Sequence, residues 1–395
     1  MATIEIYTKQ WCPYCAKAKA LLHSKGLSYN AIDVTEDETL QQEMVARSGR
    51  RTVPQLFLDG QSIGGYDDLA NLNATGELDQ RLGLPARAKL ATVYDVAVIG
   101  AGPAGLSAAI YAVRKNLSTV LVAFDLGGQL GTTYEVANYP GFQLVTGPDL
   151  VQKFFDHVTQ YGIENRIGEK VTGLQVDGRV KLIKTASGND IRAKTVIITT
   201  GAQKRKLNIP GEKELAGKGV VYCSTCDGPL FKNTRIAIIG GGNSGLEATI
   251  EMDGIAKQVF LLSRGEWNGD EILQDKVRAA KRVEALAGYQ PVEIHGSDRV
   301  TGLTIKRTET GEIRRLDVDG VFIEIGLFPN TDFVLDLVET NERGEIKVDR
   351  HGATGVRGIF AAGDATDGHD KQIVIAAGEG AKAALVAFEY LVKQV

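Results

Sequence analysis

Residues 94–114 read YDVAVIGAGPAGLSAAIYAVR, and this stretch decides the fold of the larger part of the chain. An apolar strand pattern runs to Ile99, directly into a G-x-G-x-x-G sequence that opens an alanine-rich helical pattern. Its glycines let the backbone approach a pyrophosphate, whose charge a helix N-terminus attracts. The spacing predicts an α/β dinucleotide-binding fold, although a tight glycine turn before a helix also occurs without a nucleotide. The three glycines are Gly100, Gly102 and Gly105.

A second strand pattern follows from Ser118 to Phe124 and ends at Asp125. In this fingerprint an acid about 20 residues further on binds the ribose of the nucleotide. Asp125 is therefore a candidate ribose ligand, and an aspartate in a solvated turn is the alternative.

A second G-x-G-x-x-G sequence, with Gly240, Gly242 and Gly245, again lies between a strand pattern and a helical pattern. Here Arg264 follows the second strand, where it could meet the 2′-phosphate of NADPH. Glu266 is close enough to leave NADH open. Two ordered fingerprints indicate two Rossmann-like domains, with FAD at the first and a nicotinamide nucleotide at the second.

All four cysteines fall into C-x-x-C pairs, Cys12 with Cys15 and Cys223 with Cys226. Such a pair can be a redox disulfide, half of a zinc site or a structural bridge. Zinc ribbons usually bring their pairs within about 15 to 20 residues, whereas roughly 200 residues separate these two pairs. The pattern therefore favours redox pairs and predicts no metal site. Asp227 directly follows Cys226 and could move the proton that thiol chemistry requires.

The first pair lies in a segment of about 80 residues whose pattern predicts a small α/β unit. Cys12 is placed where a strand turns into a helix, and a helix N-terminus favours thiolate over thiol. Lys9 and Lys17 could add to that field. Cys12 is thus the expected attacking sulfur and Cys15 the resolving one. The expected strands are Thr3–Thr8, Tyr29–Val34, Gln55–Leu58 and Gln61–Ile63, and the expected helices are Ala16–Leu22, Glu38–Arg47 and one from Asp67.

Composition narrows the classes of partner. The chain has 395 residues, 43% of them hydrophobic, which is enough for several domains with their own cores. A net charge of -4 argues against nucleic acid or an anionic membrane as the main partner. No apolar run approaches the roughly 18 residues of a spanning helix, and the first ten residues do not look like a signal peptide. We therefore expect a cytoplasmic protein.

The N-terminal segment closely resembles a glutaredoxin, a thioredoxin-like fold. The residues that carry the resemblance are Cys-Pro-Tyr-Cys at 12–15, Thr-Val-Pro at 52–54 and Gly-Gly-Tyr-Asp-Asp-Leu at 64–69. The resemblance implies a cis bond between Val53 and Pro54 that faces the disulfide. It also implies a glutathione-type groove lined by Tyr14, Val53, Pro54, Gly65 and Asp67.

Residues 94–395 resemble the low-molecular-weight thioredoxin reductases, and most closely the flavoprotein subunit of alkyl hydroperoxide reductase. The resemblance implies that Asp364 holds the ribitol of FAD and that the helix after Gln372 points its N-terminus at the flavin. Further implied cofactor contacts are Gln129, Asn138, Gly201, Gly363 and Ile373. The segments that carry the resemblance are 127–129, 138–141, 200–202, 210–212, 226–231, 325–330, 360–364, 371–373 and 377–380.

The two resemblances together imply a domain order. A glutaredoxin domain (1–82) and a linker (83–92) precede an FAD domain made of 93–209 and 329–395. A nicotinamide nucleotide domain (210–328) is inserted and carries the second pair. The hydrophobic pattern already thins out from Asn73 to Thr92, and this longer stretch could be partly helical around Leu78 to Leu82, with a packed connector as the alternative. The family also implies a homodimer.

The sequence departs from the relatives at two points. Phe124 occupies the position where they carry a glutamate for the adenosine ribose, so that Asp125 is a displaced substitute. The second fingerprint lacks both the His-Arg-Arg run of NADPH-dependent thioredoxin reductases and the glutamate of the NADH-dependent hydroperoxide reductase flavoprotein. The choice between NADPH and NADH stays open.

The resulting hypothesis is a flavoprotein disulfide reductase in which NAD(P)H reduces FAD, FAD reduces Cys223–Cys226, and that dithiol reduces Cys12–Cys15. By family resemblance Cys226 is the flavin-proximal sulfur, Cys223 the interchange thiol and Asp227 the acid/base. The final acceptor is a peroxiredoxin, glutathione disulfide or a thioredoxin-like protein. The alternatives are a redox-responsive binding protein and a thioredoxin reductase-like flavoprotein that takes electrons from ferredoxin.

Overall fold

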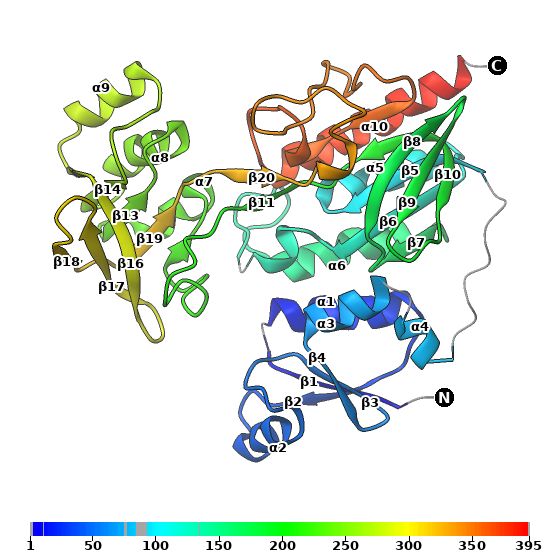
Figure 1. The fold of residues 1–395 in the computed structure, drawn as a ribbon, viewed down its shortest axis with the longest axis horizontal. Coiled ribbons are helices and arrows are strands. Elements are labelled where there is room, and N and C mark those ends of the chain that lie inside the picture. The colour runs from blue at the N-terminus through cyan, green and yellow to red at the C-terminus, as the bar shows by residue number, and fades with distance from the viewer. Residues whose placement is uncertain (1–2, 11, 75–76, 84–92, 134, 394–395) are drawn as a thin grey trace. The chain divides into compact units, whose positions relative to one another are not determined.

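The computed structural model describes residues 3–10, 12–74, 77–83, 93–133 and 135–393 (Figure 1). The chain forms two compact units, of which the first contains residues 1–203 and 329–395 and the second residues 204–328. The first unit is therefore built from two segments that flank the second unit in the sequence. Residues 84–92 of the predicted linker lie outside the described residues.

A four-stranded sheet forms the N-terminal part of the first unit, with the strand order β2-β1-β3-β4. Strand β1 pairs parallel with β2 and antiparallel with β3. Figure 1 shows α1 and α3 on one face of this sheet and α2 on the other. Apolar residues cover both faces, which makes this the predicted thioredoxin-like layer. The elements are β1 (Ile4–Thr8), α1 (Pro13–Ser24), β2 (Asn30–Asp33), α2 (Glu38–Ser48), β3 (Gln55–Leu58), β4 (Gln61–Gly64), α3 (Tyr66–Ala74) and α4 (Glu77–Arg81).

The larger sheet of the first unit has seven strands, in the order β7-β6-β5-β10-β9-β8 with β21 also paired to β10. Strands β5, β6, β7, β10 and β21 are parallel, whereas β9 pairs antiparallel with β8 and β10. The strands are β5 (Val93–Ala101), β6 (Thr119–Leu126), β7 (Glu164–Ile167), β8 (Val171–Asp177), β9 (Val180–Thr185), β10 (Ile191–Ile198) and β21 (Ile359–Ala361), and the helices are α5 (Pro103–Arg114), α6 (Gly147–Thr159) and α10 (Ile373–Val392).

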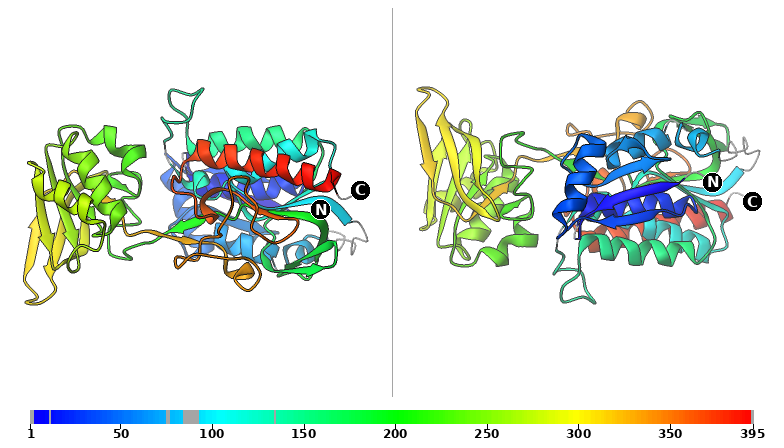
Figure 2. Two further views of the ribbon diagram at one scale, coloured as in Figure 1. Left: turned by 90° about the horizontal axis from the view of Figure 1, so that it is seen from above. Right: turned by 90° about the horizontal axis from the view of Figure 1, so that it is seen from below.

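Helices α5 and α10 lie side by side, although α5 comes before the second unit in the sequence and α10 comes after it (Figures 1 and 2). A Cβ atom at Gly380 would lie only 1.9 Å from the carbonyl oxygen of Ala104, so only glycine permits this approach. The C-terminal segment thus supplies both a strand and a covering helix to the sheet that begins at β5.

The second unit contains a parallel five-stranded sheet, with the order β12-β19-β13-β14-β15, and an antiparallel three-stranded sheet, β16-β17-β18. Buried aliphatic side chains fill both faces of the parallel sheet. The elements are β12 (Val220–Val221), α7 (Ser224–Asp227), β13 (Arg235–Ile239), α8 (Asn243–Asp253), β14 (Gln258–Ser263), α9 (Glu271–Ala279), β15 (Val283–Ala287), β16 (Tyr289–Gly296), β17 (Val300–Arg307), β18 (Ile313–Leu316) and β19 (Gly320–Ile323).

Each of the two passages of the chain between the units contains a short strand, β11 (Ala202–Lys204) and β20 (Leu327–Pro329). The remaining short elements are 3-10 helices: η1 (Leu130–Thr132), η2 (Gly228–Phe231), η3 (Asp332–Val334) and η4 (Gly363–Ala365). No described helix is both long and apolar enough to cross a bilayer.

Several predicted element bounds need correction. The second strand of the first fingerprint was expected to end at Phe124, but β6 continues through Asp125 because Leu126 pairs with Ala101 after a shift in register. Helix α1 begins at Pro13, three residues before its expected start, since proline is suited to the first turn of a helix. The predicted strand at 55–58 is confirmed, and the strand pattern expected before the second glycine sequence forms β13.

Candidate functional site

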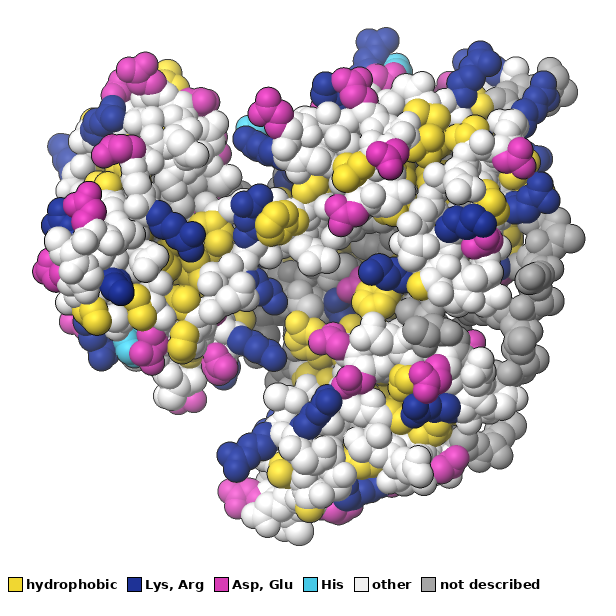
Figure 3. All heavy atoms as spheres, in the orientation of Figure 1, with side chains coloured by type: hydrophobic (Ala, Val, Ile, Leu, Met, Phe, Trp, Pro, Cys, Tyr) yellow, Lys and Arg dark blue, Asp and Glu magenta, His cyan; other side chains and the backbone are white. Residues whose placement is uncertain are grey.

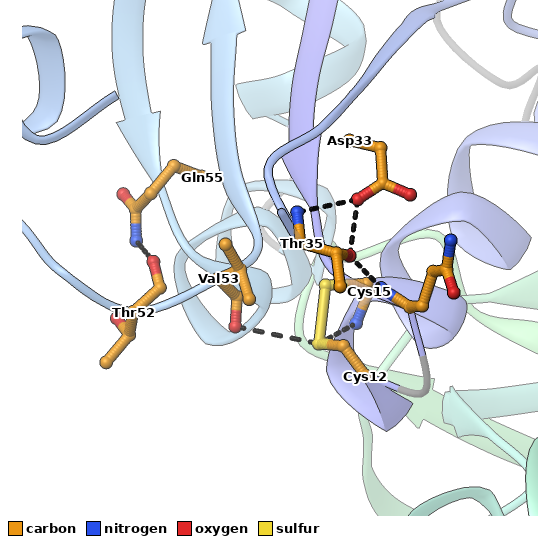
Figure 4. Close-up of a disulfide and its surroundings, with 8 residues drawn as sticks. Cys12, Cys15, Asp33, Thr35, Thr52, Val53 and Gln55 are labelled. Atoms are coloured by element: carbon orange, nitrogen blue, oxygen red, sulfur yellow. Dashed lines mark hydrogen bonds between the residues drawn. A yellow bond between two sulfur atoms is a disulfide. The ribbon is translucent and has the colours of Figure 1, made fainter. Parts of the chain in front are cut away.

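The first cysteine pair forms a disulfide where β1 leads into α1 (Figure 4). The backbone N–H of Cys15 donates to Cys12 Sγ at 3.1 Å, and the N–H of Ala16 donates to the Cys12 carbonyl at 3.1 Å. Cys15 is only 2% exposed, whereas Cys12 is half-buried. Cys12 is therefore the more accessible sulfur, as an attacking cysteine requires.

A turn with a cis Val53-Pro54 bond faces this disulfide, which confirms the bond that the resemblance implied. The Val53 carbonyl oxygen lies 3.8 Å from Cys12 Sγ, and Gln55 holds the turn by donating from Nε2 to the Thr52 carbonyl at 2.8 Å (Figure 4). On the other side of the disulfide, hydrogen bonds from Thr35 lower the pKa of Asp33.

Of the residues predicted to line a glutathione-type groove, Val53, Pro54 and Gly65 meet at this turn, and the groove itself stays a prediction. Tyr14 is 41% exposed, and burial of its ring, together with the charges of Asp67 and Asp125, raises its pKa. A Cβ atom on Gly65 would lie 3.5 Å from the Pro54 carbonyl oxygen, so the two predicted residues are in contact.

Asp68 was not predicted as part of this region, and it holds the backbone at the start of α3. It accepts a hydrogen bond from the Gly65 N–H at 2.9 Å and pairs with Arg50 at 2.6 Å. The Gly65 bond is the first cause of a lowered pKa of Asp68. An acid in the first turn after Gly-Gly is a capping pattern that could have revealed it.

The positive charges near Cys12 differ from those expected. Lys9 and Lys19 line a cavity together with Cys12, and Asp149 lines the same cavity. Lys17, however, is 7% exposed, and its ammonium group donates to Asp125 at 2.7 Å and to the Gly128 carbonyl at 3.3 Å. The expectation that Lys17 adds to the field at Cys12 is therefore wrong, because an ion pair neutralises its charge. Asp125, the predicted ribose ligand, is engaged by the same pair.

The first glycine loop has glycines with two different tasks. A Cβ on Gly100 would lie 2.3 Å from the Thr199 carbonyl oxygen, and one on Gly105 would lie 1.8 Å from the Gly100 carbonyl oxygen. Both positions thus serve close packing. A Cβ on Gly102 would have only the Gly127 carbonyl oxygen as a neighbour, at 4.0 Å. Gly102 therefore keeps the space before α5 open, as an approaching pyrophosphate requires.

The second glycine loop repeats this division. A Cβ on Gly245 would lie 2.1 Å from the Gly240 carbonyl oxygen, and one on Gly240 would lie 2.1 Å from the Glu324 carbonyl oxygen. The nearest neighbour of a Cβ on Gly242 would be Asn268 Oδ1, at 3.5 Å. Arg264, the predicted 2′-phosphate ligand, is exposed after β14.

Two groups of helices differ in how their N-termini are capped. Helices α2 and α6 are capped by the side chains of Asp37 and Thr146. Helices α5, α8 and α10 begin after Gly102, Gly242 and Gln372 without a side-chain hydrogen bond at the cap. Their N-terminal N–H groups and partial positive charge suit an anionic ligand such as a nucleotide phosphate.

Four of the residues implied for FAD meet in pairs from distant segments. Gln129 Nε2 donates to Asp364 Oδ2 at 3.1 Å, and Asn138 Nδ2 donates to Gln372 Oε1 at 3.2 Å. Gly363, with a φ of 74°, donates its N–H to Glu379 at 2.8 Å. Together with the open side of Gly102, this set of donors and acceptors fits a flavin nucleotide.

The two other residues implied for FAD stand at the ends of elements. Gly201 has a φ of 65° and directly precedes β11. Ile373 is the first residue of α10. Their roles as cofactor contacts stay predictions.

The second cysteine pair forms a disulfide at the start of the short helix α7. Cys223 caps this helix, with its Sγ accepting from the Cys226 N–H at 3.1 Å. The N–H of Asp227 donates to the Cys223 carbonyl at 3.2 Å. Both cysteines and Asp227 are half-buried, so the predicted catalytic residues of this unit lie within one helical turn.

Two acids that sequence reasoning missed hold this turn through Ser224. The Ser224 N–H donates to Glu324 Oε1 at 3.2 Å, and its Oγ donates to Glu251 Oε2 at 2.8 Å. Burial raises the pKa of Glu324 to about 7. A signal for Glu324 existed, because it is an acid in the apolar run Gly-Val-Phe-Ile-Glu-Ile-Gly. Glu324 directly follows β19, which pairs in parallel with the fingerprint strand β13. Because parallel strands end at the same edge of a sheet, Glu324 is expected at the edge where the second glycine loop lies.

Other kinds of site find no support in the part of the chain that the structure describes. Within it, no group of three or more His, Cys, Asp or Glu side chains is arranged to hold a metal ion. On the face drawn in Figure 3, basic and acidic side chains are interspersed over each unit.

Comparisons with known proteins agree with these features. A pyridine nucleotide-disulphide oxidoreductase family model matches residues 94–380, and a glutaredoxin model matches residues 4–63. The alkyl hydroperoxide reductase F protein of Staphylococcus aureus (strain Mu50 / ATCC 700699) is 39% identical over 98% of this chain and 75% of its own length.

Two solved structures resemble the larger part of the chain. Thioredoxin reductase from Streptococcus pyogenes MGAS5005 has a TM-score of 0.73 and 36% identity over 76% of this chain and 99% of its own. Thioredoxin reductase from Giardia duodenalis has a TM-score of 0.73 and 33% identity over 76% of this chain and 99% of its own.

Proposed function

This chain belongs to the pyridine nucleotide-disulphide oxidoreductase family, and we propose that it carries electrons from NAD(P)H through FAD and Cys223–Cys226 to Cys12–Cys15. It is a flavoprotein disulfide reductase with an N-terminal glutaredoxin-like domain. The observation that carries the proposal is that both cysteine pairs are disulfides in which the first sulfur accepts the N–H of the second cysteine. Such a turn is built for opening and closing of the bond.

We assign FAD to residues 93–209 and 329–395 and the nicotinamide nucleotide to residues 210–328. The open side of Gly102 and the N-termini of α5 and α10 support the first assignment, and the open side of Gly242 at α8 supports the second. Bound FAD accepts an electron pair from NAD(P)H and passes it to a disulfide. Asp364 with Gln129, and Gln372 with Asn138, would hold and orient it.

The thiol steps follow from the positions of the sulfurs. When Cys223–Cys226 receives two electrons, its S–S bond breaks and Asp227 supplies a proton to one of the two sulfurs. The Cys223 thiolate then attacks Cys12, and the Cys12–Cys15 bond breaks with Cys15 as the leaving thiolate. Cys226 attacks the mixed disulfide, which re-forms Cys223–Cys226 and leaves Cys12 and Cys15 reduced.

Transfer in this direction is downhill for typical pairs. Thioredoxin-like and glutaredoxin-like disulfides differ by about 40 to 70 mV, which corresponds to about 2 to 3 kcal/mol in favour of reducing the glutaredoxin pair. The second pair must meet the flavin and Cys12–Cys15 in turn. We therefore propose that the second unit rotates about its two connections, 201–210 and 326–330.

The final acceptor is a disulfide on a peroxiredoxin, on glutathione or on a thioredoxin-like protein. The exposed ring of Tyr14, the Val53 carbonyl next to Cys12, and the contact of Gly65 with Pro54 support a small peptide thiol such as glutathione. The likeness to the alkyl hydroperoxide reductase F protein supports a peroxiredoxin. We place the protein in the cytoplasm as a homodimer, with neither nucleic acid nor membrane as a partner.

The proposal is tested by steady-state oxidation of NADH and NADPH in parallel. The acceptors are glutathione disulfide, a thioredoxin, and a peroxiredoxin with peroxide. We expect sustained oxidation with at least one acceptor and a preference for one coenzyme. Flavin reduction without turnover of any disulfide would contradict the proposal and favour a redox-responsive binding protein.

A further inference from the structure

Two carboxylates bind the turn that carries the second cysteine pair, an arrangement that the electron path itself does not require. Ser224 lies between the two cysteines and is buried, and both of its polar groups bind carboxylates. Its N–H binds Glu324 and its hydroxyl binds Glu251. A third acid, Asp227, follows Cys226 directly.

Glu324 differs from Glu251 in its surroundings. Glu251 is exposed on α8, whereas Glu324 is partly buried beyond β19, where its own N–H is bonded to the Ile239 carbonyl at 2.9 Å. Its backbone also packs against Gly240. The carboxyl group is thus held in place between the glycine loop and the disulfide turn.

On these grounds we propose that Glu324 is a positioning residue that couples its own protonation to the thiol chemistry of Cys223 and Cys226. This inference rests on the proposed function, because it concerns the pair assigned there as the internal dithiol. An ionised Glu324 lies next to the turn in which a thiolate must form, and like charges oppose each other. A protonated Glu324 removes this opposition, so that a thiolate forms more easily.

The charges that face Glu324 decide where it titrates. Burial raises its pKa to about 7, with smaller contributions in the same direction from Glu251 and Glu247 on α8. The Ser224 N–H and Lys204 on β11 act in the opposite direction. Glu324 therefore changes charge within the range in which cells operate, whereas an ordinary glutamate is fully ionised there.

The step balances without a further reactant. Opening the Cys223–Cys226 bond takes two electrons, which the proposed path supplies from NAD(P)H, and two protons for two thiols. Glu324 neither gains nor loses electrons. Its protonation state only shifts the balance between thiol and thiolate in the product.

The test uses the full chain with Cys12→Ser and Cys15→Ser, so that only the second pair reacts. The protein is reduced with dithiothreitol, freed of reductant, and alkylated with iodoacetamide from pH 5.5 to 9, with Cys223 followed by mass spectrometry. Glu324→Gln keeps an acceptor for the Ser224 N–H but cannot ionise. We expect the pKa of the Cys223 thiol to be about one unit lower in Glu324→Gln than beside an ionised Glu324. This gives about twofold faster alkylation at pH 7, where about half of Glu324 is protonated in the parent, and about fourfold faster alkylation at pH 8.

Glu247→Gln is the matched control, since Glu247 is an exposed acid on α8 that does not bind Ser224 and makes the smallest contribution to the raised pKa of Glu324. Its profile should keep the inflection and stay close to that of the parent. The parent profile should also show an inflection near pH 7 that Glu324→Gln lacks. Coincident profiles of the parent and Glu324→Gln, or an equal shift in Glu247→Gln, would overturn the inference. If Glu324→Gln does not fold, absence of the inflection in the parent overturns it alone.

A parallel sample reduced with NADH or NADPH separates the two proposals. Failure of the coenzymes to reduce Cys223–Cys226 contradicts the proposed function. The dithiothreitol profiles decide the role of Glu324 independently of that result.

Discussion

The two C-x-x-C pairs share a local geometry but have different electrical surroundings. In both pairs the first sulfur accepts the N–H of the second cysteine at 3.1 Å. Cys12 precedes a helix of 12 residues and shares a cavity with two lysines, Lys9 and Lys19, and one acid, Asp149. Cys223 precedes a helix of four residues whose Ser224 is bound by two carboxylates.

This difference teaches that a motif of four residues does not set the behaviour of its thiols. A long helix and nearby lysines favour a thiolate, whereas nearby carboxylates oppose one. The N-terminal pair is thus suited to attack an outside disulfide at neutral pH. At the second pair, the carboxylates bound to Ser224 oppose formation of a thiolate.

The largest expected effect comes from removing one sulfur of each pair. Cys12→Ser should lower turnover of the final disulfide substrate by about a thousandfold or more, since no thiol remains to attack it. It should leave flavin reduction by NAD(P)H unchanged, as measured by the loss of flavin absorbance in stopped flow. Cys223→Ser is the matched variant, and in it the Cys12–Cys15 disulfide should stay oxidised. Turnover that survives Cys12→Ser would break the comparison.

A second prediction concerns the flavin that both pairs depend on. Gly105→Ala should destabilise the first unit by about 2 to 4 kcal/mol, because its Cβ would lie 1.8 Å from the Gly100 carbonyl oxygen. Gly102→Ala has room within the protein and should fold, but its methyl group should weaken FAD binding by about tenfold or more. Thermal unfolding and flavin content measure the two effects. Equal losses of stability in both variants would contradict the division of tasks.

A third prediction concerns Glu324, beside the second cysteine pair, and its effect on how the free energy of unfolding depends on pH. The pKa of Glu324 rises on folding from 4.5 to about 7, so the folded state binds the proton more tightly and loses stability as pH rises between these values. Glu324→Gln should therefore be more stable than the parent by about 1 to 3 kcal/mol at pH 8 and nearly equal to it at pH 4.5. Denaturant unfolding at both pH values measures this. Glu247→Gln, on the exposed surface, should show no such pH dependence.

The smallest effect is expected from changing one of the lysines near Cys12. Lys19→Glu should raise the pKa of the Cys12 thiol by about half a unit, since a single partly solvated charge acts weakly. The rate of alkylation of reduced Cys12 at pH 6.5 should fall about threefold. Lys213→Glu, an exposed change in the second unit, serves as the control. An unchanged rate in Lys19→Glu would leave the helix as the main cause of the reactivity of Cys12.

The sequence was most informative where backbone geometry depends on residue type. Glycine spacing located both nucleotide loops because a Cβ at Gly105 or Gly245 cannot be accommodated. Resemblance to glutaredoxins gave the cis Val53-Pro54 bond correctly. The resemblance to thioredoxin reductases gave Gln129, Asn138, Asp364 and Gln372 only as contacts of one cofactor. The structure pairs Gln129 with Asp364 and Asn138 with Gln372, which no local pattern could join across more than 200 residues.

The sequence was least informative where one side chain meets another from a different element. The ion pair between Lys17 and Asp125 joins residues 108 apart, and neither residue's neighbours indicate the other. Glu324 reaches the second cysteine pair through a strand that begins nearly 100 residues after it. Which charged side chains meet at these sites depends on how the elements pack together, and the hydrophobic periodicity of the sequence does not specify that packing.

The order in which the sheet of the first unit is assembled has a consequence for synthesis of the protein. Strand β21 and helix α10 complete the layer begun by β5 and α5, yet they follow the whole second unit in the chain. During synthesis on the ribosome, all strands of the N-terminal domain and of the second unit are made before the sheet that begins at β5 is closed. A nascent chain should thus complete its N-terminal domain and its second unit while the sheet of the first unit still lacks β21 and α10.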